Sequence, residues 1–400
     1  MLPVAEWRER PGLRRIVAAL TADGGAVKAV GGAVRDTLLG LAVADIDLAT
    51  PLLPEQVTQR LEAAGIKVIP TGIAHGTVTA IASGDHHEIT TLRRDVETDG
   101  RRATVAFADD WRDDAARRDF TINALYADID SGTIDDWFGG LADLETGRVA
   151  FIGDAATRIA EDHLRILRFY RFAARFGRGA LDPVSHAAVV TARQSLKSLS
   201  RERIADELLK ILSLADPRGI VGQMATDGIF AVLLPELDAD FAAAFDRLVA
   251  NEGASNATAA PLRRLAALLP ADAAIAEQVA SRLRLSTRQR KHLALLGRHR
   301  ADNRRPVRQL AHAIGVDAAR DVHLLADDVD AARAAVEALS DWTVPEMPLK
   351  GGDIVARGVA AGPEVARILK AVEAEWVAED FPDATRVAEL VDQKIGRTRD

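Results

Sequence analysis

Hydrophobic and polar residues follow different periods in the two parts of the chain. Up to about residue 150, short runs alternate apolar and polar positions and are bounded by Gly-containing turns, a pattern typical of strands. These runs are Ala26 to Val30, Ile46 to Thr50, Thr77 to Ala82 and Glu88 to Leu92. From Gly153 onward, apolar residues recur three and four positions apart among many alanines. The pattern therefore predicts a sheet-bearing module followed by an arm made of helices.

Length and composition indicate a globular protein with more than one domain. The chain has 400 residues, more than one typical core holds, and 48% of them are hydrophobic and 28% charged. No apolar run approaches the length that a membrane span needs, and the first ten residues include Glu6, Arg8, Glu9 and Arg10, so we expect a cytoplasmic protein outside the membrane. The absence of cysteine excludes disulfides and thiolate metal sites.

A basic segment stands out against a net charge of −8. Residues 282–308 contain ten Lys or Arg and one acid, Asp302. The ten are Arg282, Arg284, Arg288, Arg290, Lys291, Arg298, Arg300, Arg304, Arg305 and Arg308. Such a segment fits either a polyanionic partner, since each cation set against a phosphate releases counterions, or a solvated helix face. The charge count alone leaves both open.

The first chemical motif is a strand, a turn and a helix around Gly31 and Gly32. Two glycines at such a junction allow a close backbone approach, and the start of the following helix offers N–H groups suited to phosphate. No Gly-Lys-Ser/Thr follows, so this is not a P-loop. Taken alone, the motif also fits an ordinary tight turn.

The second motif is the pair Asp45 and Asp47, which alternates with Ile46 and Leu48. On a strand, residues two apart share a face, so both carboxylates are expected to project together and to require a cation between them. A hard ion with oxygen ligands, such as Mg²⁺, meets that need, and Glu88 on another predicted strand is a candidate third ligand. The alternative is a surface strand with solvated acids.

Two further blocks join these motifs into a family pattern. One reads Arg117-Arg118-Asp119-Phe120-Thr121-Ile122-Asn123-Ala124, and the other reads Glu161-Asp162-His163-Leu164-Arg165. With the diglycine and the paired acids, the chain resembles the bacterial-type (class II) tRNA nucleotidyltransferases, most of all the CCA-adding enzymes. The same family includes bacterial poly(A) polymerases. The motifs span roughly residues 31–171, with a looser likeness beyond.

The resemblance implies an α+β fold, with a polymerase-β-like nucleotidyltransferase head that contains a mixed sheet, followed by an elongated all-α arm. It implies four parts: a catalytic head (1–150), a neck that recognises the base (151–215), a tRNA-binding body (216–335) and a tail (336–400). The implied reaction adds or repairs the 3′-terminal CCA of tRNA from CTP and ATP, with Mg²⁺ as cofactor and without a nucleic-acid template. Alternatives are a poly(A) polymerase, a CC-adding or A-adding enzyme, and an inactive RNA-binding relative. Nothing in the sequence implies a protein partner.

The resemblance also assigns roles to residues. Asp45 and Asp47 are the implied catalytic and metal-binding acids. The implied nucleotide-binding residues are Gly31, Gly32, Arg35, Arg118, Asp119, Glu161, Asp162, Arg165, Arg168 and Arg171. The basic segment 282–308 is the expected RNA-binding surface.

Side-chain chemistry adds detail to two of these blocks. Asp119 is expected to hold Arg118 through a charge-assisted bond. A single helix is predicted from Ile159 to Gly177, so that Asp162 and Arg165 face the same way. A carboxylate accepts hydrogen bonds, which suits the exocyclic amino group of cytosine or adenine, and a guanidinium donates them, which suits the unprotonated ring nitrogen of these bases. Uracil and guanine present a keto oxygen and a ring N–H instead, so both hydrogen bonds would be lost.

Two more features complete the sequence picture. Residues 93–107 are highly charged, contain Gly100 and are predicted to form a mobile loop, which in CCA-adding relatives is thought to help the pocket change from CTP to ATP. His75 lies in a His-Gly-Thr-Val stretch that the family shares, and no chemical role follows from its position.

Overall fold

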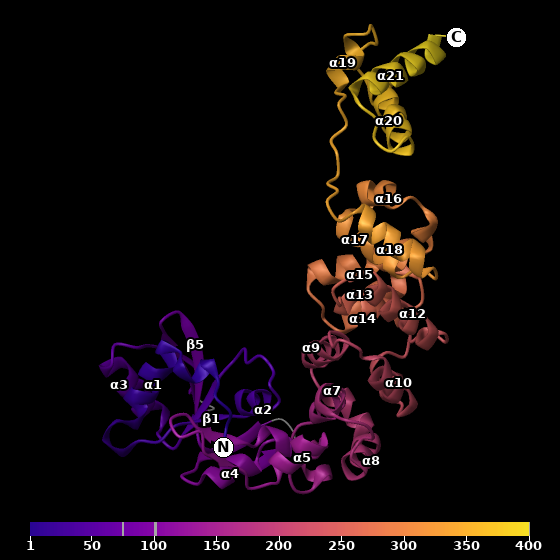
Figure 1. The fold of residues 1–400 in the computed structure, drawn as a ribbon. Coiled ribbons are helices and arrows are strands. Elements are labelled where there is room, and N and C mark those ends of the chain that lie inside the picture. Colours follow the sequence, from indigo (N-terminus) through magenta and orange to yellow (C-terminus); the bar gives the residue numbers. More distant parts are fainter. Residues whose placement is uncertain (74–75, 100–101, 400) are drawn as a thin grey trace. The chain divides into compact units, whose positions relative to one another are not determined.

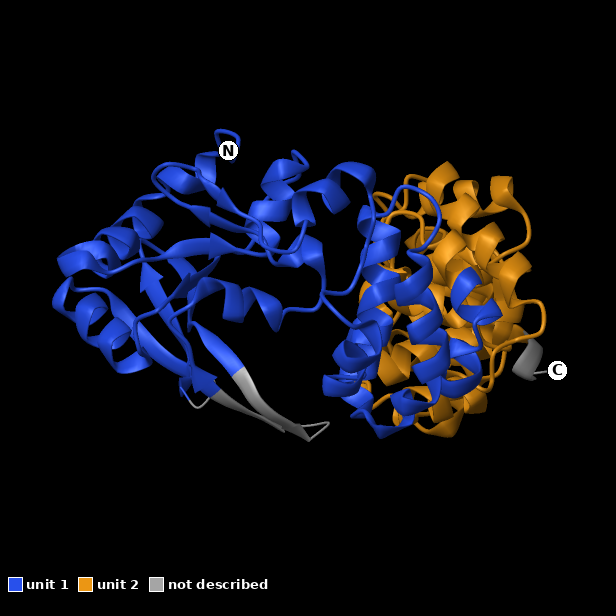
Figure 2. Ribbon diagram, turned by 90° about the horizontal axis from the view of Figure 1, so that it is seen from below, with its two compact units in different colours: residues 1–207, 223–233 blue, residues 208–222, 234–400 orange. Residues whose placement is uncertain are grey.

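The computed structural model describes residues 1–73, 76–99 and 102–399, so His75 lies outside the described residues. The chain divides into two compact units (Figure 2). The first comprises Met1–Glu207 and Gln223–Leu233, and the second comprises Leu208–Gly222 and Leu234–Asp400. The four-part division expected from the sequence stays a prediction. Across the described chain, every helix falls short of the length and apolar character that crossing a membrane requires.

The first unit contains a seven-stranded sheet in the order β3-β4-β5-β2-β1-β8-β9. Its strands are β1 (Lys28–Val30), β2 (Asp47–Thr50), β3 (Lys67–Gly72), β4 (Thr77–Ala82), β5 (Asp85–Thr91), β8 (Tyr126–Asp128) and β9 (Ile134–Asp135). The β2 and β5 strands run parallel, whereas every other neighbouring pair is antiparallel. The mixed sheet implied by the resemblance is therefore confirmed.

The four runs with strand-like alternation coincide with β1, β2, β4 and β5, because these strands bury their apolar side chains. In β4, for example, Val78 and Ala80 are buried. The edge strand β3 lacks a buried face over most of its length, and β8 and β9 are short. These strands therefore carry a weaker hydrophobic pattern, and the sequence did not reveal them.

The first unit also contains helices, of which α1 and α3 lie beside the sheet (Figure 1). They are α1 (Pro11–Thr21), α2 (Gly32–Leu38), α3 (Pro54–Ala63), α4 (Trp111–Ala116), α5 (Gly140–Thr146), α6 (Ala155–Glu161), α7 (Arg165–Phe176), α8 (Pro183–Ala192) and α11 (Ile229–Leu233), together with most of α9 (Arg201–Leu212). The α1 and α3 helices both pack against β4 and against each other. Short 3-10 helices lie at Glu6–Glu9, Ala22–Gly24, Thr121–Asn123 and Arg193–Ser198.

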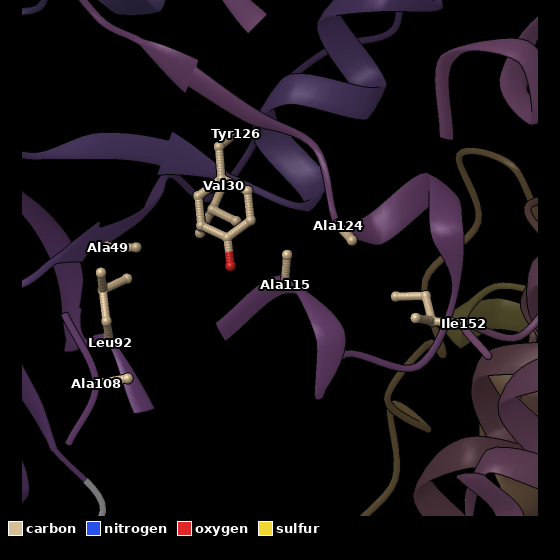
Figure 3. Close-up of a cluster of buried hydrophobic side chains, with 8 residues drawn as sticks. All are labelled: Val30, Ala49, Leu92, Ala108, Ala115, Ala124, Tyr126 and Ile152. Carbon is tan, nitrogen blue, oxygen red and sulfur yellow. The ribbon is translucent and has the colours of Figure 1, made fainter. Parts of the chain in front are cut away.

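A hydrophobic cluster joins the strands that carry the chemical motifs to α4 (Figure 3). It consists of Val30, Ala49, Leu92, Ala108, Ala115, Ala124, Tyr126 and Ile152, with Trp111, Trp137 and Phe138 packed around it. All eight central side chains are removed from water, which is the dominant favourable term in folding. The cluster therefore holds β1, β2 and β8 together with α4.

The second unit is built from helices. They are α10 (Arg218–Thr226, shared with the first unit), α12 (Phe241–Ala254), α13 (Pro261–Ala267), α14 (Ala273–Arg282), α15 (Thr287–His299), α16 (Val307–Ile314), α17 (Val316–Leu324), α18 (Val329–Ala338), α19 (Gly351–Val355), α20 (Pro363–Ala378) and α21 (Ala384–Arg399). A 3-10 helix spans Arg300–Arg304. Every secondary-structure element after Gly153 in the described chain is helical, as the periodicity predicted.

The predicted loop at residues 93–107 is wrong, because the segment forms a two-stranded antiparallel sheet. Its strands are β6 (Arg93–Asp99) and β7 (Arg102–Phe107), and the Gly100 tip lies outside the described residues. Charged residues do not prevent strand formation here, because each strand satisfies the backbone groups of the other. Polarity was therefore a poor guide at this position.

Candidate active site

The diglycine turn joins β1 to α2 through a backbone conformation that glycine alone adopts readily. Gly31 has φ +66° and ψ −116°, outside the region open to other residues, and Gly32 begins the helix. The Gly31 N–H donates to the Leu125 carbonyl at 3.0 Å, and the Gly31 carbonyl accepts from the Arg35 N–H at 3.0 Å. The turn is thus fixed on both sides, and the predicted strand, turn and helix are confirmed.

The paired acids flank a buried residue beside this turn. Asp45 and Asp47 are exposed, whereas Ile46 between them is buried, so the two carboxylates lie on the solvent side. Asp45 precedes β2, which begins at Asp47, but the alternation of burial continues through both residues. The parallel register of β2 and β5 aligns Leu48 with Ile89, which sets Glu88 next to Asp47.

The electrostatics of these acids fit a cation. The pKa of Asp47 lies above its ordinary value. Although the side chain keeps an exposed surface, the protein around its carboxylate partly desolvates the charged form, and the carboxylates of Glu88 and Asp45 repel it, whereas Arg118 acts in the opposite direction. Carboxylate oxygens are the ligands that Mg²⁺ prefers. No group of three His, Cys, Asp or Glu side chains in the described residues is already arranged to hold a metal ion. The third ligand, Glu88, therefore stays a prediction.

Arg118 lies beside the diglycine turn. A methyl group added to Gly31 would come within 3.4 Å of Arg118 Nη1. The guanidinium donates from Nε to the Tyr126 hydroxyl at 2.9 Å and from Nη2 to Asp114 Oδ2 at 3.3 Å. The sequence did not single out Asp114 or Tyr126, because an acid and a tyrosine separated along the chain form no recognisable motif.

The prediction that Asp119 bonds to Arg118 is wrong, because Asp119 binds Arg168 instead. Its carboxylate accepts from Arg168 Nε at 2.7 Å and from Asn123 Nδ2 at 2.9 Å. Burial alone would raise the pKa of Asp119, but Arg168 and the hydrogen bonds of Asn123 and Phe120 outweigh it and hold the pKa below its ordinary value. Neighbouring residues in the chain point apart here, so adjacency in sequence was misleading.

The single helix predicted from Ile159 to Gly177 is also wrong. The α6 helix ends at Glu161, Asp162 has the extended conformation φ −151° and ψ 105°, and α7 begins at Arg165. Asp162 Oδ1 accepts from the Leu164 N–H at 3.1 Å, a local bond through which aspartate competes with helix formation. The interruption separates two helices that the apolar period joined.

Asp162 and Arg165 consequently have separate partners. Asp162 Oδ2 accepts from Arg203 Nη2 at 2.7 Å. Arg165 donates to Glu161 Oε2 at 2.5 Å and to the Arg117 carbonyl at 3.0 Å. The two groups are close along the chain, but their shared contact with a base stays a prediction.

Two arginines on α7 stack on a phenylalanine ring of the same helix. Arg168 and Arg171 lie over the Phe172 ring, with the carbon of each guanidinium 5.2 and 4.5 Å from the ring centre. Arg171 also donates to Glu207 on α9. These cation–π contacts attract the guanidinium groups to the ring and so restrict the motion of the two arginine side chains. The α7 face therefore presents an ordered set of guanidinium groups.

Arg35 is more enclosed than a phosphate contact would suggest. It is buried, bonds to Asp36 and Asn123 at 2.8 and 2.5 Å, and lies 4.1 Å over the Phe176 ring. Burial lowers its pKa from the ordinary value. Arg35 thus ties α2 to α7 and to the segment around Asn123, and its contact with a nucleotide stays a prediction.

The basic segment of the second unit divides into two groups. Arg282 pairs with Glu236, Arg308 donates to Asp380 at 3.3 Å, and Arg300 donates to the Leu269 carbonyl at 2.9 Å. These three are engaged within the fold. The other seven are exposed, and they are Arg284, Arg288, Arg290, Lys291, Arg298, Arg304 and Arg305. Arg288 and Lys291 also line a cavity of about 900 Å³ in this unit.

Comparison with known proteins shows the family. A family model described as the poly A polymerase head domain matches residues 27–150, and one described as a probable RNA and SrmB-binding site of polymerase A matches residues 180–241. The mouse (Mus musculus) protein named CCA tRNA nucleotidyltransferase 1, mitochondrial, is 32% identical over 384 residues, which cover 91% of this chain and 86% of that protein. This chain belongs to the CCA tRNA nucleotidyltransferase family.

Further members agree over most of the length. A protein of Levilactobacillus brevis named CCA-adding enzyme is 31% identical, covering 88% of this chain and 90% of its own length. Among solved structures, the Bacillus stearothermophilus CCA-adding enzyme in complex with CTP has a TM-score of 0.76 at 26% identity and covers 98% of this chain and 99% of that one. The Thermotoga maritima enzyme complexed with tRNA has a TM-score of 0.72 at 21% identity, covering 96% and 94%, and shares the fold.

Proposed function

We propose that this nucleotidyltransferase adds or repairs the 3′-terminal CCA of tRNA, using CTP and ATP and releasing pyrophosphate. The observation that carries the proposal is the position of Asp45 and Asp47 on the solvent side of the sheet next to Glu88, within electrostatic reach of Arg118. Membership of a family whose named relatives match nearly the whole chain supports the same reaction.

In the proposed reaction, the 3′-hydroxyl of the RNA attacks the α-phosphorus of the nucleotide. A new bond forms between that oxygen and the α-phosphorus, and the hydroxyl proton is released to solvent. The bond between the α-phosphorus and the oxygen that bridges it to the β-phosphorus breaks, and pyrophosphate leaves. Asp45 and Asp47 would hold Mg²⁺, which neutralises triphosphate charge and activates a hydroxyl when bound. The chain itself contributes positioning and electrostatic stabilisation, the main requirements of phosphoryl transfer.

The base is chosen by side chains in this proposal. Asp162 accepts from the exocyclic amino group and Arg165 donates to the ring nitrogen of cytosine or adenine. Both side chains already engage other partners, Arg203 and Glu161, so the base has to replace or share those bonds. The exposed cations of the basic segment would bind the phosphates of tRNA.

A product assay tests the proposal. Purified protein is incubated with Mg²⁺, tRNA lacking the CCA end, and CTP and ATP singly and together. Three added nucleotides followed by a stop support CCA addition. Long A tails on any RNA would indicate a poly(A) polymerase, the second member of the same family, whereas CC alone or a single A would indicate an enzyme that performs part of the addition. No incorporation under any condition would refute nucleotide transfer.

A further inference from the structure

One edge of the Arg118 guanidinium is hydrogen-bonded to the protein, and the other edge faces the diglycine turn. Its Nε and Nη2 donate to Tyr126 and Asp114, whereas Nη1 lies beside Gly31. The Arg118 side chain is 22% exposed. The hydrogen bonds thus fix the arginine through Nε and Nη2 and place Nη1 beside Gly31.

The hydrogen bonds behind Arg118 have a fixed direction. A tyrosine hydroxyl has a single proton, and the Tyr126 hydroxyl donates that proton to Asp114 Oδ2 at 2.5 Å. Its oxygen lone pairs are therefore available to accept from Arg118 Nε. Burial raises the pKa of Tyr126 far above its usual value, so the hydroxyl keeps its proton at any working pH. Asp114 orients the tyrosine, and the tyrosine in turn orients the arginine.

Packing and strand register make this support rigid. Tyr126 is fully buried in the hydrophobic cluster (Figure 3). Its ring meets Trp111 and Trp137 edge-on, with centroids 5.8 and 5.5 Å away. Tyr126 on β8 pairs with Val30 on β1, the residue that precedes Gly31. The tyrosine and the turn therefore belong to adjacent paired strands, which fixes the distance between the arginine and the turn.

We propose that Asp114 and Tyr126 are positioning residues that hold Arg118 against the triphosphate of the bound nucleotide. This inference rests on the proposed function and deepens it. The triphosphate is common to CTP and ATP, so Arg118 in this position serves both substrates equally. Base selection remains with other residues. Neither positioning residue touches the nucleotide, because both are buried behind the arginine.

Asp114 also joins this support to the β6–β7 hairpin. Its Oδ1 accepts from the Arg93 N–H at 3.3 Å, and Arg93 is the first residue of β6. One buried carboxylate, with 2% of its surface exposed, therefore fixes both the root of the hairpin and the triphosphate-facing arginine.

The decisive variant is Tyr126→Phe, which removes the hydroxyl and keeps the ring packing. Loss of a hydrogen bond to a charged group is expected to weaken CTP binding, measured directly without turnover, by about tenfold. The KM values for CTP and ATP should rise by the same factor, with kcat changed by less than about twofold. Inhibition by inorganic pyrophosphate should weaken in parallel, since pyrophosphate occupies only the phosphate positions.

A double-mutant cycle shows whether Tyr126 acts through Arg118. In an Arg118→Ala background, Tyr126→Phe should cause no further loss of CTP binding, because the group it positions is gone. The matched control is Tyr170→Phe, which removes a hydroxyl from another buried tyrosine that donates to Asp227 at 2.7 Å. It should lower the melting temperature to a similar extent while CTP and pyrophosphate binding stay unchanged.

Several outcomes overturn the inference. CTP binding equal to wild type in Tyr126→Phe removes the positioning role, as do additive losses in the double variant. A change in the ratio of the KM values for CTP and ATP would assign the arginine to the base instead of the triphosphate. Because binding is measured without turnover, weaker CTP binding in Tyr126→Phe supports the inference even where wild-type protein fails to extend tRNA, a failure that would refute the proposed function alone.

Discussion

The carboxylate of Asp119 accepts a hydrogen bond from Arg168 Nε at 2.7 Å, although the two residues are 49 positions apart in the chain. This contact joins the segment after α4 to the middle of α7. Both residues belong to the same compact unit, and Asp119 is 7% exposed. The pair thus fixes an α7 arginine relative to the segment that carries Arg118.

The Asp119 pair predicts loss of stability in acid. The pKa of Asp119 is lower in the folded chain than in the unfolded chain, whose value is about 3.9. The stabilisation is therefore fully present above that pH and is lost as the pH falls through the lower folded pKa. Thermal unfolding followed from pH 7 to pH 2.5 should show a smaller acid-induced loss in Asp119→Asn than in wild type.

At neutral pH the same variant should be destabilised. Replacing the carboxylate by an amide weakens its bond to Arg168, at a cost of roughly 2 kcal/mol in the free energy of unfolding. Asp109→Asn is the control, because Asp109 is an exposed acid of the same unit. Equal acid profiles for wild type and Asp119→Asn would contradict the prediction.

The paired acids predict a loss of chemistry without a loss of RNA binding. Asp45→Ala and Asp47→Ala should each reduce nucleotide incorporation by roughly three orders of magnitude, since a metal-assisted step supplies several kcal/mol. The dissociation constant for tRNA, measured by filter binding, should stay within about twofold because these acids face the proposed metal. Surviving turnover in either variant would mean that other residues hold the metal.

The position of Glu88 predicts that its substitution weakens Mg²⁺ binding without abolishing activity. It lies next to Asp47 on the neighbouring strand, so Glu88→Gln should raise the Mg²⁺ concentration for half-maximal incorporation by about tenfold. Maximal activity at saturating Mg²⁺ should largely recover. Chelation with EDTA should abolish incorporation by wild type, and added Mg²⁺ should restore it. An unchanged Mg²⁺ requirement in Glu88→Gln would exclude it as a ligand.

Asp162 predicts a change in base selectivity. A carboxylate only accepts hydrogen bonds, whereas the amide of Asp162→Asn also donates and can meet the keto oxygen of uracil. The ratio of kcat/KM for CTP to that for UTP should fall at least about tenfold. Competition assays with both nucleotides measure this ratio. The control is Arg203→Ala, which removes the partly exposed partner of Asp162 without adding a donor; it should leave the ratio close to wild type.

The basic segment predicts a steep salt dependence of tRNA binding. Each phosphate contact contributes a slope of roughly −0.7 to −0.9 in log K against log salt. Arg288→Gln and Lys291→Gln should therefore each reduce the slope by about one. Arg333→Gln, which removes an exposed arginine outside the segment, should leave the slope unchanged. A flat response in wild type would remove the segment from the RNA-binding surface.

Local patterns predicted a large part of the fold because they reflect burial. The four runs with period two became strands of the mixed sheet, and the helical period after Gly153 became helices. The diglycine turn was predictable because its backbone conformation requires glycine, and the paired acids because alternation with Ile46 and Leu48 sets their face.

Contacts between side chains far apart in the chain could not be predicted from the sequence. The apolar period continues across Asp162, but the bond between its side chain and the backbone of Leu164 interrupts the helix. Asp119 selects Arg168 over its neighbour Arg118 because the fold brings α7 close to it. The tyrosine and aspartate behind Arg118 come from β8 and α4, and only the tertiary structure shows that they meet.

The backbone at Gly31 makes this position intolerant of mutation. With φ +66° and ψ −116°, any β-carbon would be strained whether its side chain were small, polar or large. Saturation mutagenesis read out by complementation of a strain that depends on this gene should therefore recover glycine alone at residue 31. By contrast, Asn256 has φ +49° in a region that other residues enter at moderate cost, and its codon should accept several substitutions.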